Sequence, residues 1–117
     1  MKPAPVKSAV SIEVLEQLDI RVGTILSVEE VPGSRKLVQL TVDFGDHTRA
    51  ILSGMKGERE NLQDLVGRQT LFIVNLEPRK MAGRTSEGML LDLGYADGIS
   101  PALAIPERAV PNGSRAG

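Results

Sequence analysis

Positive charge is concentrated in one stretch of the chain, residues 75–91, which reads NLEPRKMAGRTSEGMLL. Within it, residues 78–86 hold three cations, Arg79, Lys80 and Arg84, and no acid. Pro78 fixes its own φ and pushes the preceding residue toward extended geometry, so the chain is stiff just before its cations. A stiff basic segment loses little entropy when it grips an anion. The pattern predicts an anion-binding segment, and solvated surface charges fit it equally well.

Residue types for other chemistry are scarce. The chain has no cysteine, which excludes disulfides, thiolate catalysis and cysteine-based zinc sites. Its one histidine, His47, lies beside Asp46 in a predicted turn and makes a poor metal site alone. We find no convincing pair of acids, metal cluster or activated nucleophile. The sequence therefore predicts a protein that is not an enzyme and needs no cofactor or metal.

Bulk composition is that of an ordinary globular domain. With 117 residues, we expect one domain. The net charge of −1 argues against strong non-specific nucleic-acid binding but permits a local basic face. The N-terminal stretch MKPAPVKSAV lacks a long apolar run, so we expect no signal peptide, no membrane span and a cytoplasmic protein.

Apolar periodicity predicts a strand-rich fold. Residues 1–10 are expected to be a flexible tail, and Ser11 to cap a short helix over residues 12–18 that must dock on its own domain or on a partner subunit. Alternation predicts strands at 20–29, 38–44, 48–53, 69–75 and 88–93, with a short helix at 57–67. Gly23 suggests a bulge or sharp bend. Three prolines between 94 and 117 predict an edge segment or extended wrap.

This element order predicts an all-β fold, a five-stranded Greek-key barrel of the OB-fold type. It has a short N-terminal helix and a short helix between the third and fourth strands. The domain is expected to cover residues 11–117, including a C-terminal extension.

A second basic pair, Arg35 and Lys36, follows the first strand. Ligands of this fold bind on strands two and three and the flanking loops. We expect one side of the barrel to carry a basic patch made of Arg21, Lys36, Arg49, Ser53 and Arg79. Only three aromatics are present, Phe44, Phe72 and Tyr95, and the two phenylalanines have core parity. Base stacking would be hard to build, so the sequence favours structured RNA read by phosphates, 2′-hydroxyls and shape.

Several segments resemble the tRNA-binding domain family: LDIRVGTILSVEEVPGSRKLVQLTVDFGD (18–46), ILSGMK, DLVGRQTLFIVNLEPRKMAGRTSEGMLL and PERAVPNGSR. Similar domains occur as free dimeric tRNA-binding proteins, at the C-terminus of methionyl-tRNA synthetase and as CsaA-type chaperones. The resemblance implies an OB-fold that grips the outer corner of tRNA, and homodimerisation through the N-terminal helix and C-terminal segment. It implies an RNA face that includes Arg21, Lys36, Ser53, Arg79, Lys80, Ser86 and Met89. The chain departs from the family at 33–36, where Gly-Ser-Arg-Lys replaces the usual Asn-Ala-Asp-Lys.

Two functions follow as hypotheses. The first is a non-enzymatic, structure-specific tRNA-binding protein with little sequence preference, acting alone or with an aminoacyl-tRNA synthetase. The alternative is a CsaA-type secretion chaperone that binds unfolded polypeptides. It would use an apolar pocket between subunits lined by Met55, Met81 and Met89, since methionine adapts to varied partners.

Overall fold

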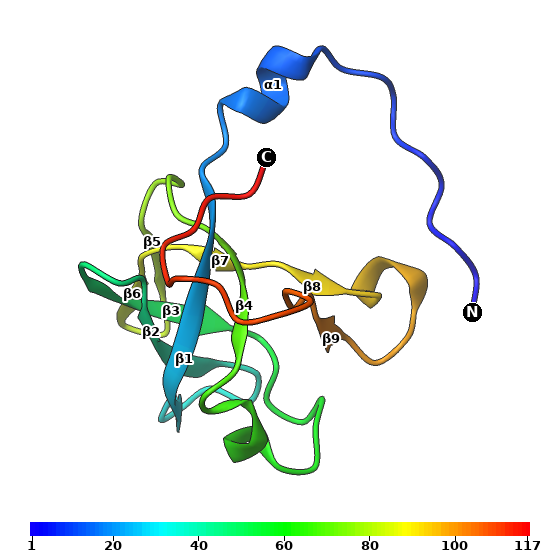
Figure 1. Cartoon of the computed structure of the whole chain (residues 1–117). Coiled ribbons are helices and arrows are strands. Elements are labelled where there is room, and N and C mark those ends of the chain that lie inside the picture. The colour runs from blue at the N-terminus through cyan, green and yellow to red at the C-terminus, as the bar shows by residue number, and fades with distance from the viewer.

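A curled antiparallel sheet of five strands forms the body of the protein, as the computed structural model of residues 1–117 shows (Figure 1). The sheet contains β1 (Ile20–Glu30), β2 (Val38–Asp43), β3 (Thr48–Ser53), β4 (Gln69–Ile73) and β7 (Met89–Leu90), in the order β3-β2-β1-β4-β7. Smaller elements are α1 (Ile12–Glu16), the 3₁₀ turns η1 (Leu62–Leu65) and η2 (Tyr95–Asp97), and the pairs β5 (Arg79–Met81) with β6 (Arg84–Ser86) and β8 (Asp92–Leu93) with β9 (Ala102–Leu103). The predicted all-β, OB-like architecture is confirmed.

Alternating side chains of β2 build the core. Val38, Leu40 and Val42 are fully buried, while the residues between them are half-buried, as a strand with one core face requires. Phe44 continues this face and meets Phe72 of β4 edge to face, with ring centroids 5.5 Å apart. The core parity predicted for both phenylalanines is confirmed, and neither ring is available to stack on a base.

The bend in β1 has a different cause from the one predicted. The register against β2 shifts between Ile25 and Ser27, so the bulge lies there and not at Gly23. Because of this shift Ile25 enters the core and Leu26 is 46% exposed. Gly23 is required for close packing instead: a Cβ there would lie 2.5 Å from Val42 Cγ1 and 2.9 Å from Phe44 Cε1.

The C-terminal segment covers the part of β1 that β2 leaves unpaired. The N–H of Val22 donates to Ser114 O at 2.9 Å, and the N–H of Gly113 donates to Val22 O at 2.7 Å. The backbone of Arg115 forms an isolated antiparallel β-bridge with that of Arg21. The predicted extended wrap is confirmed, and it protects backbone groups that would otherwise form an open edge.

Helical elements are shorter than predicted. The helix expected over 57–67 is reduced to η1, and the helix expected over 12–18 ends at Glu16. Ser11 occupies the N-cap position, but its side chain makes no capping hydrogen bond. The expected fifth strand is divided into β7 and β8, because β8 leaves the sheet to pair with β9. None of the helices has the length and apolar character needed to cross a bilayer.

Replacing Gly23 with alanine should lower the free energy of unfolding by about 1–3 kcal/mol, because the added methyl group overpacks the core against Val42 and Phe44. Urea denaturation measures the change. Gly54→Ala is the matched control, since a Cβ at Gly54 meets nothing within 4 Å. Equal stability of the two variants would contradict the packing role of Gly23.

Candidate nucleic-acid interface

The basic segment folds as a β-hairpin, where the sequence suggested an irregular stiff loop. Lys80 of β5 pairs with Thr85 of β6. The two turn residues, Ala82 and Gly83, have φ of 51° and 77°, and positive φ at both positions matches the twist of a tight hairpin. Arg79 and Lys80 are exposed. We call residues 79–86 the basic hairpin.

The basic hairpin is attached to the open edge of β3. The N–H of Leu52 donates to Ser86 Oγ at 2.9 Å, and the Ser86 hydroxyl donates to Gly88 O at 2.9 Å. One residue on, Glu87 pairs with both backbone groups of Ala50: its N–H donates to Ala50 O at 2.9 Å, and its Oε1 accepts from Ala50 N at 3.0 Å. Two side chains and one backbone N–H thus complete the edge of β3 where a further strand would otherwise pair, and these contacts close the barrel.

This attachment gives Ser86 a structural position. Ser86 is 3% exposed, and its hydroxyl is occupied both as donor and as acceptor. The hydroxyl is therefore buried and its single proton is already donated, although the sequence suggested a hydroxyl at an RNA surface. Its neighbour Thr85 is exposed.

Lys36 and Ser53 lie toward the end of β3 along which the basic hairpin extends. Ser53 pairs with Val38, two residues beyond the exposed Lys36. On the adjacent pair, Arg84 of the hairpin donates to Gln39 Oε1 at 3.0 Å. Strand pairing therefore brings Lys36 and Ser53 to the same end of the barrel as the hairpin's turn. Met89, paired with Ile73, is 48% exposed beyond the hairpin's other end.

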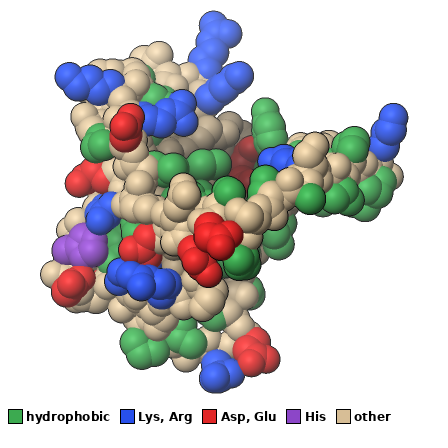
Figure 2. All heavy atoms as spheres, turned by 90° about the horizontal axis from the view of Figure 1, so that it is seen from above, with side chains coloured by type: hydrophobic (Ala, Val, Ile, Leu, Met, Phe, Trp, Pro, Cys, Tyr) green, Lys and Arg blue, Asp and Glu red, His purple; other side chains and the backbone are tan.

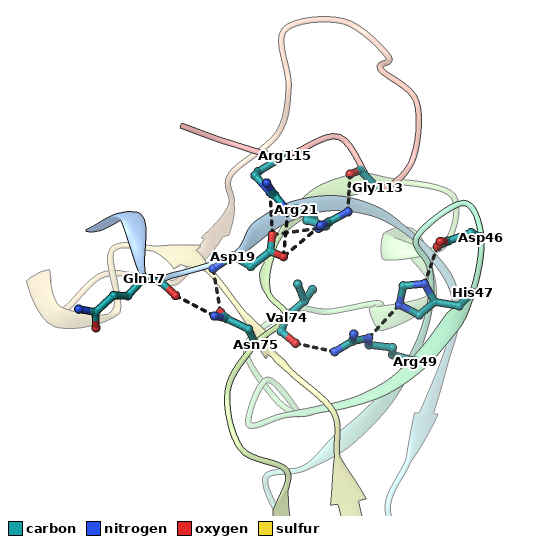
Figure 3. A network of polar contacts seen from close by, with 10 residues as sticks. All are labelled: Gln17, Asp19, Arg21, Asp46, His47, Arg49, Val74, Asn75, Gly113 and Arg115. Atoms are coloured by element: carbon teal, nitrogen blue, oxygen red, sulfur yellow. Dashed lines mark hydrogen bonds and ion pairs between the residues drawn. The ribbon is translucent and has the colours of Figure 1, made fainter. Parts of the chain in front are cut away.

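Arg21 lies at the start of β1, where its side chain points toward Asp19 (Figure 3). Its Nε and Nη2 donate to the two carboxylate oxygens of Asp19 at 2.9 and 3.1 Å. Arg115 Nε also donates to this carboxylate, at 3.2 Å. The hydrogen bond from Arg21, supported by Arg115, lowers the pKa of Asp19 below its usual value. Arg21 is thus a paired cation at the start of β1, whereas Lys36 follows the other end of this strand.

Two residues whose roles the sequence did not reveal, Asn75 and Glu87, hold the chain on either side of the hairpin. Asn75 donates through Nδ2 to Gln17 O at 2.7 Å and accepts from the N–H of Asp19 at 2.7 Å, tying the chain after β4 to the end of α1 (Figure 3). After the hairpin, Glu87 bonds both backbone groups of Ala50. An asparagine after a strand and an acid in a turn carry no local signal of these distant partners.

Apolar side chains of α1 are left uncovered. Ile12 is 62% exposed and Leu15 49%. Together with Leu18, Ile20 and Ala116 they line a groove of about 490 Å³ between α1 and the C-terminal end. Figure 2 looks down on the side of the molecule that carries α1 in Figure 1 and shows hydrophobic side chains at its surface. A helix this short is not stable without a packing partner.

A family model described as a putative tRNA binding domain matches residues 20–115. The chain belongs to the tRNA-binding domain family. It is 43% identical over 119 residues to a methionine–tRNA ligase of Methanococcus maripaludis, a match that covers 97% of this chain and 18% of the ligase. The chain thus spans less than a fifth of the length of that curated relative.

Two solved structures cover the chain more evenly. A MetRS-related protein from Pyrococcus horikoshii aligns with a TM-score of 0.86 and 30% identity, covering 95% of this chain and 100% of that one. A CsaA chaperone from Bacillus anthracis aligns with a TM-score of 0.81 and 30% identity, covering 94% and 100%. The family and fold implied by the sequence resemblance are confirmed.

Replacing Ser86 with alanine should lower the free energy of unfolding by about 1–3 kcal/mol, because the buried N–H of Leu52 loses its acceptor. Thr85→Ala, which removes an exposed hydroxyl from the same strand, should stay within about 0.5 kcal/mol of the wild type. Thermal or urea unfolding checks both. A Ser86 variant as stable as the Thr85 variant would contradict this account of barrel closure.

Proposed function

We propose that this chain binds folded tRNA without catalysing a reaction, and that it recognises the outer corner of the tRNA by shape and charge. The observation that carries the proposal is the basic hairpin, which bears the exposed Arg79 and Lys80 and is attached to β3 through Ser86, in a chain of the tRNA-binding family. Lys36, Arg79 and Lys80 would neutralise phosphates, Ser53 would hydrogen-bond sugar or phosphate, and Met89 would pack against exposed ribose or base.

Two further residues from the sequence prediction have narrower roles in the proposal. Arg21 supports the surface from its ion pair with Asp19. Ser86 contributes by holding the hairpin, since its hydroxyl is already used within the protein. The cytoplasm, where tRNA works, is the expected location, and an aminoacyl-tRNA synthetase is an expected partner.

Structured RNA suits this surface better than single strands do. Single-strand binders of this fold stack bases on aromatic side chains. Here Phe44 and Phe72 are 2% and 0% exposed. Tyr95 lies in η2, which follows the basic hairpin in the chain only after β7 and β8. Recognition must then rest on phosphates, 2′-hydroxyls and contour, which depend little on sequence.

The proposal includes a homodimer formed through α1 and the C-terminal segment. The groove lined by Ile12, Leu15 and Ala116 is apolar and exposed, and α1 buries none of its residues in its own subunit. A second copy supplies the same apolar helix, so the surface can be self-complementary about a two-fold axis.

Chaperone activity is the second candidate, favoured by the structural similarity to CsaA. The predicted methionine-lined pocket needs correction, because Met55 is 1% exposed within the core cluster and cannot line a surface pocket. The groove beside α1 is the apolar surface left for an unfolded polypeptide. An unfolded polypeptide that competes with self-association, while tRNA does not, would support this candidate.

Binding of total tRNA should weaken with salt, and log affinity should fall against log salt with a slope of about 3–4 in magnitude, as three to five phosphate contacts require. The double variant Arg79→Ala, Lys80→Ala should bind more weakly and show a slope smaller by about 2. Fluorescence anisotropy across a salt series measures both quantities.

The matched control is Lys2→Ala, Lys7→Ala, which removes the same charge from the exposed N-terminal segment. It should keep the wild-type slope. Single-stranded RNA of equal length and duplex DNA should bind more weakly than tRNA. A salt-independent affinity, or an equal loss in both double variants, would contradict the proposed surface.

Replacing Leu15 with glutamate should convert a dimer into a monomer, because a charge would be buried at the apolar contact between the two copies of α1. Sedimentation equilibrium should give about twice the 12.6 kDa chain mass for the wild type and the single mass for the variant. Leu26→Glu, at a site with similar exposure on β1, should remain dimeric. A monomeric wild type at micromolar concentration would refute the dimer.

A further inference from the structure

Arg49 belongs by charge to the predicted basic patch, yet its guanidinium is turned toward the protein backbone (Figure 3). Its Nη1 donates to Val74 O at 2.6 Å and to Glu87 O at 3.0 Å. The guanidinium carbon also lies 5.9 Å from the centroid of the Phe44 ring. Three of its five N–H donors are engaged once the bond from Nε is counted, which leaves only the two N–H groups of Nη2 for another partner.

The two carbonyl groups held by Arg49 bracket the basic hairpin. Val74 is the last residue before the segment 75–86 that contains the hairpin, and Glu87 is the first residue after it. One guanidinium nitrogen therefore bonds the residues immediately before and after the segment 75–86. These partners are 25 and 38 residues away from Arg49 in sequence, so the contact forms only when the barrel closes.

His47 fixes the orientation of this clamp. Arg49 Nε donates to His47 Nε2 at 2.9 Å, and His47 Nδ1 lies 2.6 Å from Asp46 Oδ1. Arginine can only donate, so Nε2 is the acceptor and the ring proton is on Nδ1, where it bonds the Asp46 carboxylate. The imidazole also stacks on Phe44, with centroids 5.5 Å apart. The Arg49 guanidinium is thus held at both Nε and Nη1.

We propose that Arg49 is a positioning residue for RNA binding: it clamps the neck of the basic hairpin and does not contact phosphate itself. The inference rests on the proposed function and deepens it. By joining Val74 and Glu87, the clamp keeps Arg79 and Lys80 ordered before RNA arrives, so binding does not have to immobilise the hairpin. A clamp and a phosphate ligand differ in what their removal does to the salt dependence.

The test compares Arg49→Met, Arg49→Lys and Arg79→Ala in tRNA binding over a salt series. Methionine keeps an unbranched side chain but removes every hydrogen-bond donor and the charge. Arg49→Met should weaken tRNA binding about tenfold, on the order of one or two charge-assisted hydrogen bonds, with the wild-type salt slope. Arg79→Ala should lower the slope by about 1. Arg49→Lys should behave like Arg49→Met, because an ammonium lacks the planar fork that reaches three acceptors.

Amide hydrogen exchange of the free protein gives an independent readout. Residues 79–86 should exchange faster in Arg49→Met and Arg49→Lys than in the wild type, and at the wild-type rate in Arg79→Ala. Should Arg49→Met fail to fold, hydrogen exchange of Arg49→Lys decides the clamp, because lysine keeps the charge that sets the salt slope. A salt slope reduced by about 1 in Arg49→Met, or hairpin exchange unchanged in Arg49→Lys, would overturn the clamp, and the reduced slope would make Arg49 a phosphate ligand.

Failure of the proposed function gives a different result. If the wild type does not bind tRNA at low salt, the proposed function is refuted and exchange alone decides the clamp. Faster exchange of 79–86 in the Arg49 variants then supports the clamp, and unchanged exchange overturns it.

Discussion

The edge of β3 is the constraint on which the rest of this structure depends. A strand edge leaves backbone groups that must find partners or remain exposed to other chains. Here the groups of Ala50 and the N–H of Leu52 are satisfied by Ser86 and Glu87, which lie at the end of the basic hairpin. The contacts that close the barrel are therefore the same contacts that fix the hairpin. The stability of the barrel and the shape of its cationic surface become one property.

This arrangement explains how a chain with a net charge of −1 can present a positive surface. Two acids near the hairpin are engaged within the protein, since Glu87 accepts from the N–H of Ala50 and Asp19 pairs with Arg21 and Arg115, whereas Glu77 is exposed. The hairpin cations Arg79 and Lys80 have no such carboxylate partner. A local field of one sign on a nearly neutral body favours a polyanion at this site without favouring it everywhere.

The sequence predicted what depends on short-range pattern. Alternation from Val38 to Phe44 was enough to identify a strand and its core face, and Pro78 with three cations was enough to mark the basic segment. Contacts between segments that are distant in the chain could not be predicted from the sequence. A hydroxyl at Ser86 inside a basic segment looks like an RNA ligand until β3 is placed beside it, and Arg49 looks like a patch residue until its carbonyl partners appear. Gly23 illustrates a third case, because a glycine needed for close packing and one needed for a bulge look alike in sequence.

We expect one RNA surface to run along the basic hairpin and the adjoining end of the β2–β3 pair. Amide hydrogen exchange of the whole chain, with and without saturating tRNA, tests whether this surface exists. Bound tRNA should slow the exchange of residues 36, 53, 79–85 and 89. Exchange should change little in the groove between η1 and the C-terminal segment, whose lining includes Arg59, Arg68 and Ile105. Protection of that groove, with residues 79–85 unchanged, would contradict the claim.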